Sequence, residues 1–514
     1  MARGLLGIDL GTGSAKAIVV AMDGSVLGRG SAEYPIHQPM PGYAEQDPEE
    51  WWRGTVRAVR AALADAGDVN ITAIGLSGQM HGTVLVGADG EAIGPAIIWA
   101  DTRSARQVEE ITELIGAERL IELAGSPLAV GFQAATIRWV QQEQPERWAR
   151  VQIILLPKDY FRWRLTGVYA TEPSDASSTL LLDVRTRDWS DEILRGLGVR
   201  RDQLPVIAES TAATGKLNSE AAAELGLPTG TPVIAGGADA PLAALAAGVV
   251  DPASMLLTIS TGSQVILPTY EARIDPKGRI HTWCSCLAPE ADRNRDSATG
   301  AAWYQMGATM ASGLAMRWLR DRVFDLPQED AYDRMSSWAA KTPPGAGGLL
   351  FLPYLAGERT PHMDPQARGL FLGLTADHDR GHLTRAVMEG ATLALYDAYL
   401  VLASLGATPR QAILAGGGVR SALWRQIVAD VFGIPILPLA TVEGSAMGAA
   451  LIAGAGVGEL ELTSAARAWA RYDVPVLPNT QAHAIYEQLL PVFHSAYVKH
   501  REDFRFLASL ASRS

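Results

Sequence analysis

The sequence predicts an α/β protein built from two large domains. Its 514 residues exceed what one hydrophobic core usually serves. Short apolar runs that end in small or polar residues predict buried strands, and they occur at 71–76, 233–235 and 413–415. Helical periodicity is clearest at 381–405 and 484–511. Strands that alternate with helices are typical of α/β folds, where ligands gather at the carboxyl ends of the strands.

Composition narrows the class of protein. Apolar residues make up 48% and charged residues 19%, as in a folded enzyme, and the net charge of −12 argues against a nucleic-acid binder. The two cysteines, Cys284 and Cys286, are too few for a disulfide framework and are expected to be reduced. No signal peptide precedes the first strand, and no apolar run reaches the roughly 18 residues that span a membrane. We therefore expect a cytoplasmic protein that binds neither nucleic acid nor membrane.

Two segments about 250 residues apart resemble each other. Residues 6–14 and 256–263 are each a short apolar run that ends in Thr-Gly-Ser and is followed by a second strand-like run. This pattern predicts a strand, a tight turn and a strand in each half, as in a duplicated fold. Chance similarity of eight residues is the alternative.

Both Thr-Gly-Ser turns are candidate phosphate sites. Glycines let backbone N–H groups approach phosphate oxygens, and hydroxyl groups add donors. Asp9 precedes the first turn, and a carboxylate there would repel phosphate unless a cation such as Mg²⁺ lay between them. The alternative is a hairpin turn in which Asp9 bonds local backbone. The candidate phosphate-binding residues are Gly11, Thr12, Gly13, Ser14, Thr261, Gly262 and Ser263.

Asp239 lies between a predicted strand and a predicted helix. A carboxylate in that place can accept the proton of a substrate hydroxyl during phosphoryl transfer. An unperturbed aspartate has a pKa of about 3.9, so we expect Asp239 to be ionised at neutral pH. A helix N-cap is an equally good interpretation of the residue alone.

Two further motifs follow strand ends. One motif opens a helical stretch and consists of Gly416, Gly417 and Gly418, followed by Ser421. The glycines could allow a flat adenine or its ribose to approach the backbone. The alternative is that they allow close packing of the helix on the sheet. Gln79, Met80 and His81 could contact a sugar through hydrogen bonds and an apolar face, although a lone histidine is more often structural.

Taken together, these residues resemble the FGGY carbohydrate kinases and, within that family, the xylulokinases. The resemblance runs from about residue 4 to about 480. Each motif is weak alone, but their shared order is specific. Besides the motifs above, it rests on 45–48, 156–160, 174–177, 357–362 and 369–374.

The resemblance implies two actin-like, ribonuclease H-like domains flanking a catalytic cleft. It implies an N-terminal sugar-binding domain at 1–246, a C-terminal nucleotide-binding domain at 247–490 and a helical tail at 491–514. By the same resemblance Asp239 matches the catalytic base and Asp9 the metal-associated aspartate, with Asp239 also near the metal. ATP, Mg²⁺ and a homodimer are implied as well. The residues matched to sugar binding are Gln79, Met80, His81, Trp99 and Asp101.

Two departures leave the acceptor open. Xylulokinases usually have an asparagine after the catalytic aspartate, where this chain has Ala240, and another after the tryptophan, where it has Ala100. D-xylulose is the first choice of acceptor, and another ketose, a polyol such as glycerol or erythritol, or a sugar acid is the alternative. An actin-like ATPase or chaperone, and a sugar-binding regulator without activity, are the rivals from other classes.

Overall fold

A computed structural model describes residues 2–289, 300–440 and 443–511. Its contacts divide the chain into two compact units. The first comprises Met1–Asp251, Pro268–Tyr304 and Thr441–Ala470, and the second comprises Pro252–Leu267, Gln305–Ala440 and Arg471–Ser514.

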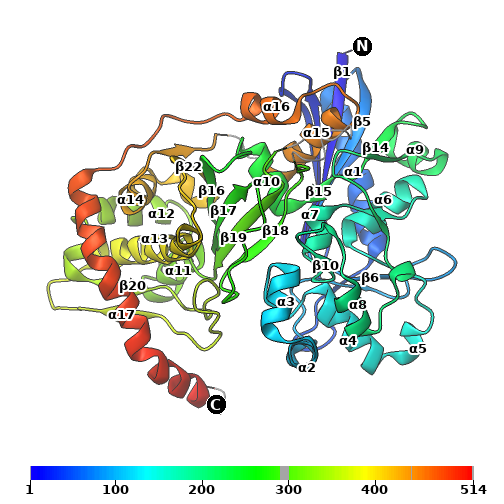
Figure 1. The fold of residues 1–514 in the computed structure, drawn as a ribbon. Coiled ribbons are helices and arrows are strands. Elements are labelled where there is room, and N and C mark those ends of the chain that lie inside the picture. Colours follow the sequence, from blue (N-terminus) through cyan, green and yellow to red (C-terminus); the bar gives the residue numbers. More distant parts are fainter. Residues whose placement is uncertain (1, 290–299, 441–442, 512–514) are drawn as a thin grey trace. The chain divides into compact units, whose positions relative to one another are not determined.

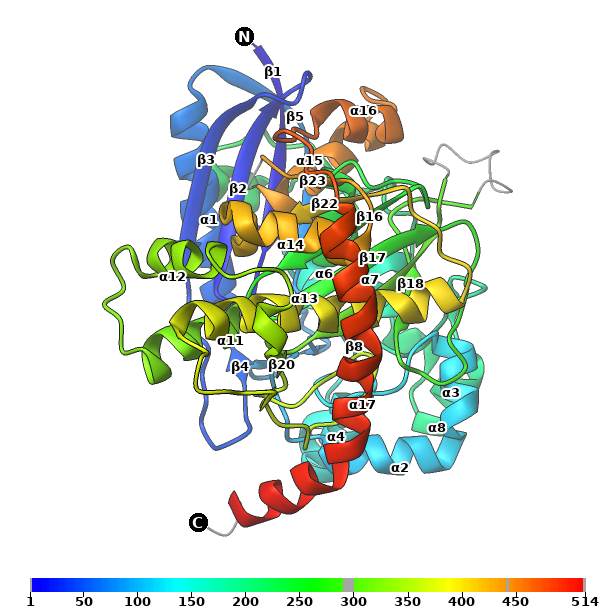
Figure 2. The same cartoon turned by 90° about the vertical axis from the view of Figure 1, so that its left-hand side faces the viewer.

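The first unit is organised around a seven-stranded sheet with the order β13-β14-β5-β1-β2-β3, to which β15 adds beside β5. Strands β1 and β2, and β2 and β3, are antiparallel, whereas β5 runs parallel to β1, β14 and β15. Figure 2 shows β1, β2 and β3 side by side. The strands are β1 (Ala2–Leu10), β2 (Ser14–Ala21), β3 (Val26–Glu33), β5 (Val69–Gly78), β13 (Ala213–Lys216), β14 (Pro232–Ile234) and β15 (Gly237–Ala238).

Helices cover both faces of this sheet (Figure 1). Alternate residues of β1 enter two different cores: Leu6 and Ile8 pack toward α1, α6 and α9, and Leu5 packs toward α10, α15 and α16. Because both faces are buried there, the strand is apolar from Gly4 to Ile8. The helices are α1 (Pro48–Ala66), α6 (Pro157–Thr166), α9 (Ser219–Leu225), α10 (Asp239–Ala246), α15 (Gly444–Gly456) and α16 (Leu462–Trp469).

Smaller elements complete the first unit. Its remaining helices are α2 (Ala105–Ile115), α3 (Ala117–Ala124), α4 (Gln133–Glu143), α5 (Pro145–Trp148), α7 (Pro173–Ser177) and α8 (Asp191–Leu197). Its short strands are β4 (Glu45–Gln46), β6 (Val84–Val86), β7 (Ala96–Ile97), β8 (Ile153–Leu155), β9 (Ala170–Thr171), β10 (Leu182–Asp183), β11 (Asp188–Trp189), β12 (Val206–Ile207) and β18 (His281–Cys284).

The second unit repeats the strand pattern of the first. Its order is β19-β17-β16-β22-β23, where β16 and β17 form an antiparallel hairpin and β16, β22 and β23 are parallel. The hairpin β16–β17 therefore corresponds to β1–β2, and β22 corresponds to β5, which confirms the predicted α/β class and the predicted duplication. The strands are β16 (Ser254–Ile259), β17 (Ser263–Thr269), β19 (Trp303–Thr309), β22 (Gln411–Ala415) and β23 (Ile436–Pro438), with the hairpin β20 (Leu350–Leu352) and β21 (Leu370–Leu372).

Its helices include the two that periodicity predicted, α13 and α17. By length and composition α13 could cross a bilayer, but 78% of its most apolar window is buried, as in the core helix of a folded domain. The helices are α11 (Gly313–Trp318), α12 (Ala331–Ala340), α13 (Arg380–Ser404), α14 (Ala422–Phe432) and α17 (Thr480–Ala511).

Helix α15 lies so close to the first sheet that β1 and β5 need glycine at the contact. A Cβ on Gly7 would collide with the Ala446 carbonyl oxygen, and one on Gly75 would collide with that of Ala449. Both obstacles are helix backbone, which cannot move aside as a flexible side chain can.

Gly75→Ala should therefore lower the free energy of unfolding by about 3 kcal/mol, the upper range for overpacking a core. Urea denaturation followed by circular dichroism measures this change. Gly13→Ala is the matched control, since no atom lies within 4 Å of a Cβ at Gly13. Equal stability of the two variants would contradict the close-packing argument.

Candidate active site

The first Thr-Gly-Ser turn joins β1 to β2 and is held by side chains from elsewhere in the unit. Gln46 Nε2 donates to the Thr12 carbonyl oxygen (2.6 Å), and Trp99 Nε1 donates to Thr12 Oγ1 (2.9 Å). Tyr34 Oη donates to the Gly11 carbonyl oxygen (2.5 Å). Gly13 is exposed, with open space beside its Cα. The turn is thus fixed on one side and accessible on the other.

Strand register brings the two predicted aspartates to one edge of the sheet. Asp9 is the Cα partner of Ser77 on β5, and Ser77 is the partner of Gly237 on β15, two residues before Asp239. Ser77 Oγ donates to Asp9 Oδ1 (2.8 Å). Burial raises the pKa of Asp9, although hydrogen bonds from Ser77 and Ser445 and the charge of Lys16 oppose the rise.

Asp239 begins helix α10 and is only partly buried. Burial and then the charge of Asp9 raise the pKa of Asp239 to about 7. The prediction that Asp239 is ionised at neutral pH is therefore wrong, because burial of the carboxyl, and after it the charge of Asp9, opposes ionisation. Ala238 occupies the N-cap position, while the Asp239 carboxylate bonds to its own N–H and that of Ala240.

The predicted sugar-contact residues occupy unequal positions. Met80 is buried, and His81 adopts a left-handed backbone (φ 68°) and stacks on Phe132 at 4.0 Å between ring centroids. His81 Nδ1 lies 2.7 Å from the Ser178 carbonyl oxygen. Because a carbonyl oxygen only accepts, Nδ1 carries the proton, and Nε2 is the acceptor of the neutral ring.

Gln79 and Trp99 are connected to the turn, whereas the contacts of Asp101 are with other parts of the first unit. Gln79 is buried and donates to Gln46 Oε1 (2.8 Å), so it steadies the glutamine that holds Thr12. Asp101 is buried, accepts from the Ala44 N–H (2.6 Å) and pairs with Arg103 (2.7 Å). Trp99 is 41% exposed, which leaves much of its ring accessible beside the turn.

The second Thr-Gly-Ser turn lies in the other unit, between β16 and β17. The Ser312 and Leu314 N–H groups donate to the Thr261 carbonyl oxygen, both at 2.9 Å. Ser263 is buried and its hydroxyl donates to Ser312 Oγ (2.6 Å), whereas Thr261 is exposed. A Cβ on Gly262 would collide with the Thr309 carbonyl oxygen, so the turn requires glycine there.

A cavity of about 510 Å³ lies beside this turn, within the second unit. Its volume is in the range of small-molecule sites. Of the predicted residues, Gly417, Gly418, Ser421 and Thr261 line it, and Gly416 is adjacent with φ 88°. Ser421 also caps α14, since its Oγ accepts from the Trp424 N–H (3.2 Å). Sequence reasoning missed the rest of the lining, which includes Met316, Arg317, Tyr332, Ser336 and Met388.

The segment 357–362 braces the end of β19. Glu358 Oε1 accepts from the N–H groups of Met310 and Arg359, both at 2.8 Å, and Thr360 Oγ1 accepts from the Ala308 N–H (3.2 Å). Burial raises the pKa of Glu358 to about 8, although these two N–H groups oppose the rise. Among the described residues, no cluster of three or more His, Cys, Asp or Glu could hold a metal ion.

A duplicated α/β fold with an aspartate pair at the ends of β1 and β15 and a cavity of about 510 Å³ is compatible with a phosphotransferase. Residues 5–246 match the model for the N-terminal domain of the FGGY family of carbohydrate kinases, and residues 260–457 match its C-terminal domain. The chain belongs to this family, and it is an ATP-dependent carbohydrate kinase with two actin-like domains.

Xylulose kinases and a gluconokinase are among the relatives that this chain resembles over most of its length. Xylulose kinase of Staphylococcus epidermidis is 36% identical over 96% of this chain and 96% of its own length. Gluconokinase of Bacillus subtilis is 29% identical over 95% of this chain and 94% of its own length. The crystal structure of xylulose kinase from Rhodospirillum rubrum has a TM-score of 0.91 at 29% identity, covering 98% of this chain and 100% of that chain.

The second unit should lose stability as pH rises from about 5 to about 8. In that window folded Glu358 keeps a proton that an unfolded glutamate, with a pKa of about 4.3, has already released. The free energy of unfolding then falls by on the order of 1 kcal/mol per pH unit. Glu358→Gln should flatten this slope in urea titrations at several pH values.

Glu329→Gln, an exposed glutamate of the same unit, is the control and should keep the wild-type slope. If Glu358→Gln kept that slope too, another group would be responsible for the pH dependence.

Proposed function

We propose that the protein transfers the γ-phosphoryl group of ATP to a primary hydroxyl of D-xylulose. The observation that carries this proposal is the Asp9–Asp239 pair at the ends of β1 and β15, on either side of β5, where a raised pKa suits Asp239 to accept a proton. The xylulose kinase relatives, together with Met80 and His81, support the choice of acceptor.

Each proposed role follows from placement. Asp239 orients the acceptor hydroxyl and takes its proton as the oxygen–phosphorus bond forms and the bond to the β-phosphate oxygen breaks. The two Thr-Gly-Ser turns bind phosphate oxygens through backbone N–H groups. The cavity at Gly417 and Gly418 receives the nucleoside, and the apolar faces of Met316 and Met388 suit an adenine ring.

Mg²⁺ fits the aspartate pair. Magnesium is usually held by one or two carboxylates together with waters and substrate phosphates, so a three-residue cluster is not required. Burial raises the pKa of Asp239, and the negative charge of Asp9 raises it further, so a cation beside the two carboxylates would relieve their repulsion. When bound, the ion neutralises charge on the phosphates. A homodimer and a cytoplasmic location are also part of our proposal.

Asp239→Asn should lower kcat by about 10³-fold, within the 10² to 10⁴ range for loss of a general base. ATP binding and the thermal unfolding temperature should stay close to wild type, because Asn keeps the shape of the side chain. ADP release in a coupled assay, with calorimetric ATP titration, measures both. The control is Asp68→Asn, which changes an exposed aspartate of the same unit and should leave the protein fully active. Near-normal turnover by Asp239→Asn would refute the assignment of Asp239 as the base.

A sugar-acid acceptor is the second candidate, because a gluconokinase is among the relatives and Ala240 and Ala100 replace asparagines usual in xylulokinases. A panel of D-xylulose, D-ribulose, glycerol, erythritol and D-gluconate decides between them. We expect kcat/KM for D-xylulose to exceed the others at least about tenfold, which corresponds to about 1.4 kcal/mol. Turnover of D-gluconate but of no other acceptor would overturn D-xylulose as the acceptor. ATP hydrolysis that is stimulated by unfolded peptide, and by none of these acceptors, would support the chaperone alternative.

A further inference from the structure

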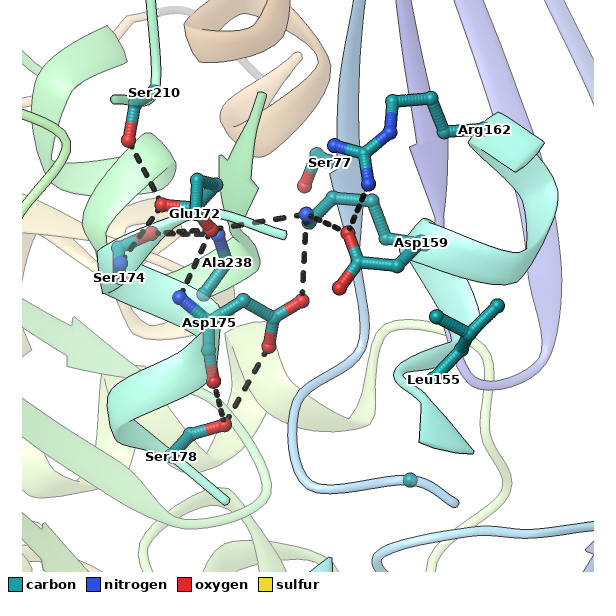
Figure 3. A network of polar contacts seen from close by, with 12 residues as sticks. Ser77, Leu155, Asp159, Arg162, Glu172, Ser174, Asp175, Ser178, Ser210 and Ala238 are labelled. Carbon is teal, nitrogen blue, oxygen red and sulfur yellow. Dashed lines mark hydrogen bonds and ion pairs between the residues drawn. The ribbon is translucent and has the colours of Figure 1, made fainter. Parts of the chain in front are cut away.

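A cluster of fully buried charges lies near Ala238, the last residue of β15 (Figure 3). Lys158 Nζ lies 2.7 Å from Asp159 Oδ1, 3.7 Å from Glu172 Oε1 and 3.8 Å from Asp175 Oδ2. Arg162 Nη2 lies 3.2 Å from Asp159 Oδ1. All five side chains have no exposed surface. Buried ion pairs of this kind rarely stabilise a fold more than apolar residues would, so their presence calls for another reason.

Glu172 is the hub of the cluster. Its Oε1 accepts from Ser174 Oγ (3.0 Å) and the Asp175 N–H (2.9 Å), and its Oε2 accepts from the Ser174 N–H (2.7 Å) and Ser210 Oγ (2.8 Å). Four donors on one carboxylate fix its orientation fully. Glu172 thereby caps helix α7 and joins it to the segment that contains Ser210.

Two backbone contacts connect this hub to the catalytic strand. The Ala238 N–H donates to Ser174 Oγ (3.0 Å), and the Gly236 N–H donates to the Ser210 carbonyl oxygen (3.0 Å). Ala238 pairs with Gly78 of β5, so the Ser174 hydroxyl supplies an acceptor from outside the sheet. Hydrogen bonds from the Gly236 and Ala238 N–H groups therefore hold both ends of the segment 236–238, immediately before Asp239.

Lys158 supports the same arrangement. A Cβ on Gly78 would lie 2.8 Å from Lys158 Cβ, so the lysine packs against the end of β5 that pairs with Ala238. Burial opposes the charge of Lys158, but Asp159, Glu172 and Asp175 raise its pKa. Lys158 therefore keeps its positive charge, which offsets the negative charge of the carboxylates around it.

We propose that Glu172 and Ser174 are positioning residues for phosphoryl transfer, which hold the Ala238–Asp239 peptide in place through the relay Ala238 N–H to Ser174 Oγ to Glu172. This inference rests on the proposed function, since it takes Asp239 as the base. A misplacement of about 1 Å at a catalytic group can cost about 100-fold in rate, which explains why buried charges are retained here.

Ser174→Ala should lower kcat by about 10- to 100-fold, with the KM for ATP and for the acceptor changed less than about threefold. A positioning role predicts this split because binding groups stay in place while the base moves. Ser174→Thr, which keeps the hydroxyl, should restore most of kcat. Thr179→Val is the matched control, since Thr179 is equally buried and its hydroxyl donates to the Ala176 carbonyl oxygen, not to the strand of Asp239.

A double variant tests whether Ser174 acts through Asp239. In the Asp239→Asn background, Ser174→Ala should reduce the residual rate less than about threefold, because residues that act as a unit are strongly non-additive. A further loss of the full 10- to 100-fold would overturn the inference. So would a kcat loss in Thr179→Val equal to that in Ser174→Ala, or a raised KM with unchanged kcat.

If Ser174→Ala fails to fold by circular dichroism, Ser210→Ala decides. It removes one of the four donors to Glu172 and leaves Ser174 in place, so a several-fold lower kcat at unchanged KM supports the relay and an unchanged kcat overturns it. Wild-type protein that turns over no acceptor would refute the proposed function. Active wild type with fully active Ser174→Ala would refute the positioning role alone.

Discussion

Repulsion between two carboxylates at the ends of β1 and β15, on either side of β5, is the constraint on which the candidate site of the first unit depends. Asp9 and Asp239 are brought to one sheet edge by the pairing of β1, β5 and β15, and the fold must hold them there against their charge. Ser77 bonds Asp9 from the strand between them, and Ser445 approaches from the start of α15. The sheet, the helix and the buried cluster around Glu172 therefore serve one placement.

The two copies of the duplicated sheet carry different candidate sites. The hairpins β1–β2 and β16–β17 end in the same three residues, yet different side chains brace them. Thr12 is held by Gln46 and Trp99, while Thr261 is held by backbone groups that follow β19. The aspartate pair occurs in the first unit and the cavity of about 510 Å³ in the second. One strand pattern thus supports two kinds of site because the loops differ.

Features that depend on a few adjacent residues could be predicted from the sequence, and features that depend on distant partners could not. The strands near Ile8, the two turns and helices α13 and α17 follow from local patterns and agree with the structure. The prediction for the ionisation of Asp239 is wrong because its pKa depends first on burial and then on the charge of Asp9, and neither is visible in the local pattern. The supporting contacts of Gln79 and Asp101 likewise come from residues that pattern does not connect. Met316 and Met388 have the spacing of ordinary core residues, so no sequence signal marks them as cavity lining.

Helix α15 has a consequence for how the chain is made. It covers one face of the first sheet, and its backbone meets Gly7 and Gly75, yet it spans Gly444–Gly456. At about 5 to 20 residues per second, translation reaches α15 roughly 20 to 75 s after β5 has been synthesised. During that interval the apolar residues around Leu5 and Ala73 lack α15 and α16, and α10 is the one helix of their core cluster that has been synthesised. The nascent chain therefore depends on its last hundred residues to complete the core of its first hundred, and premature termination would leave that face open to aggregation.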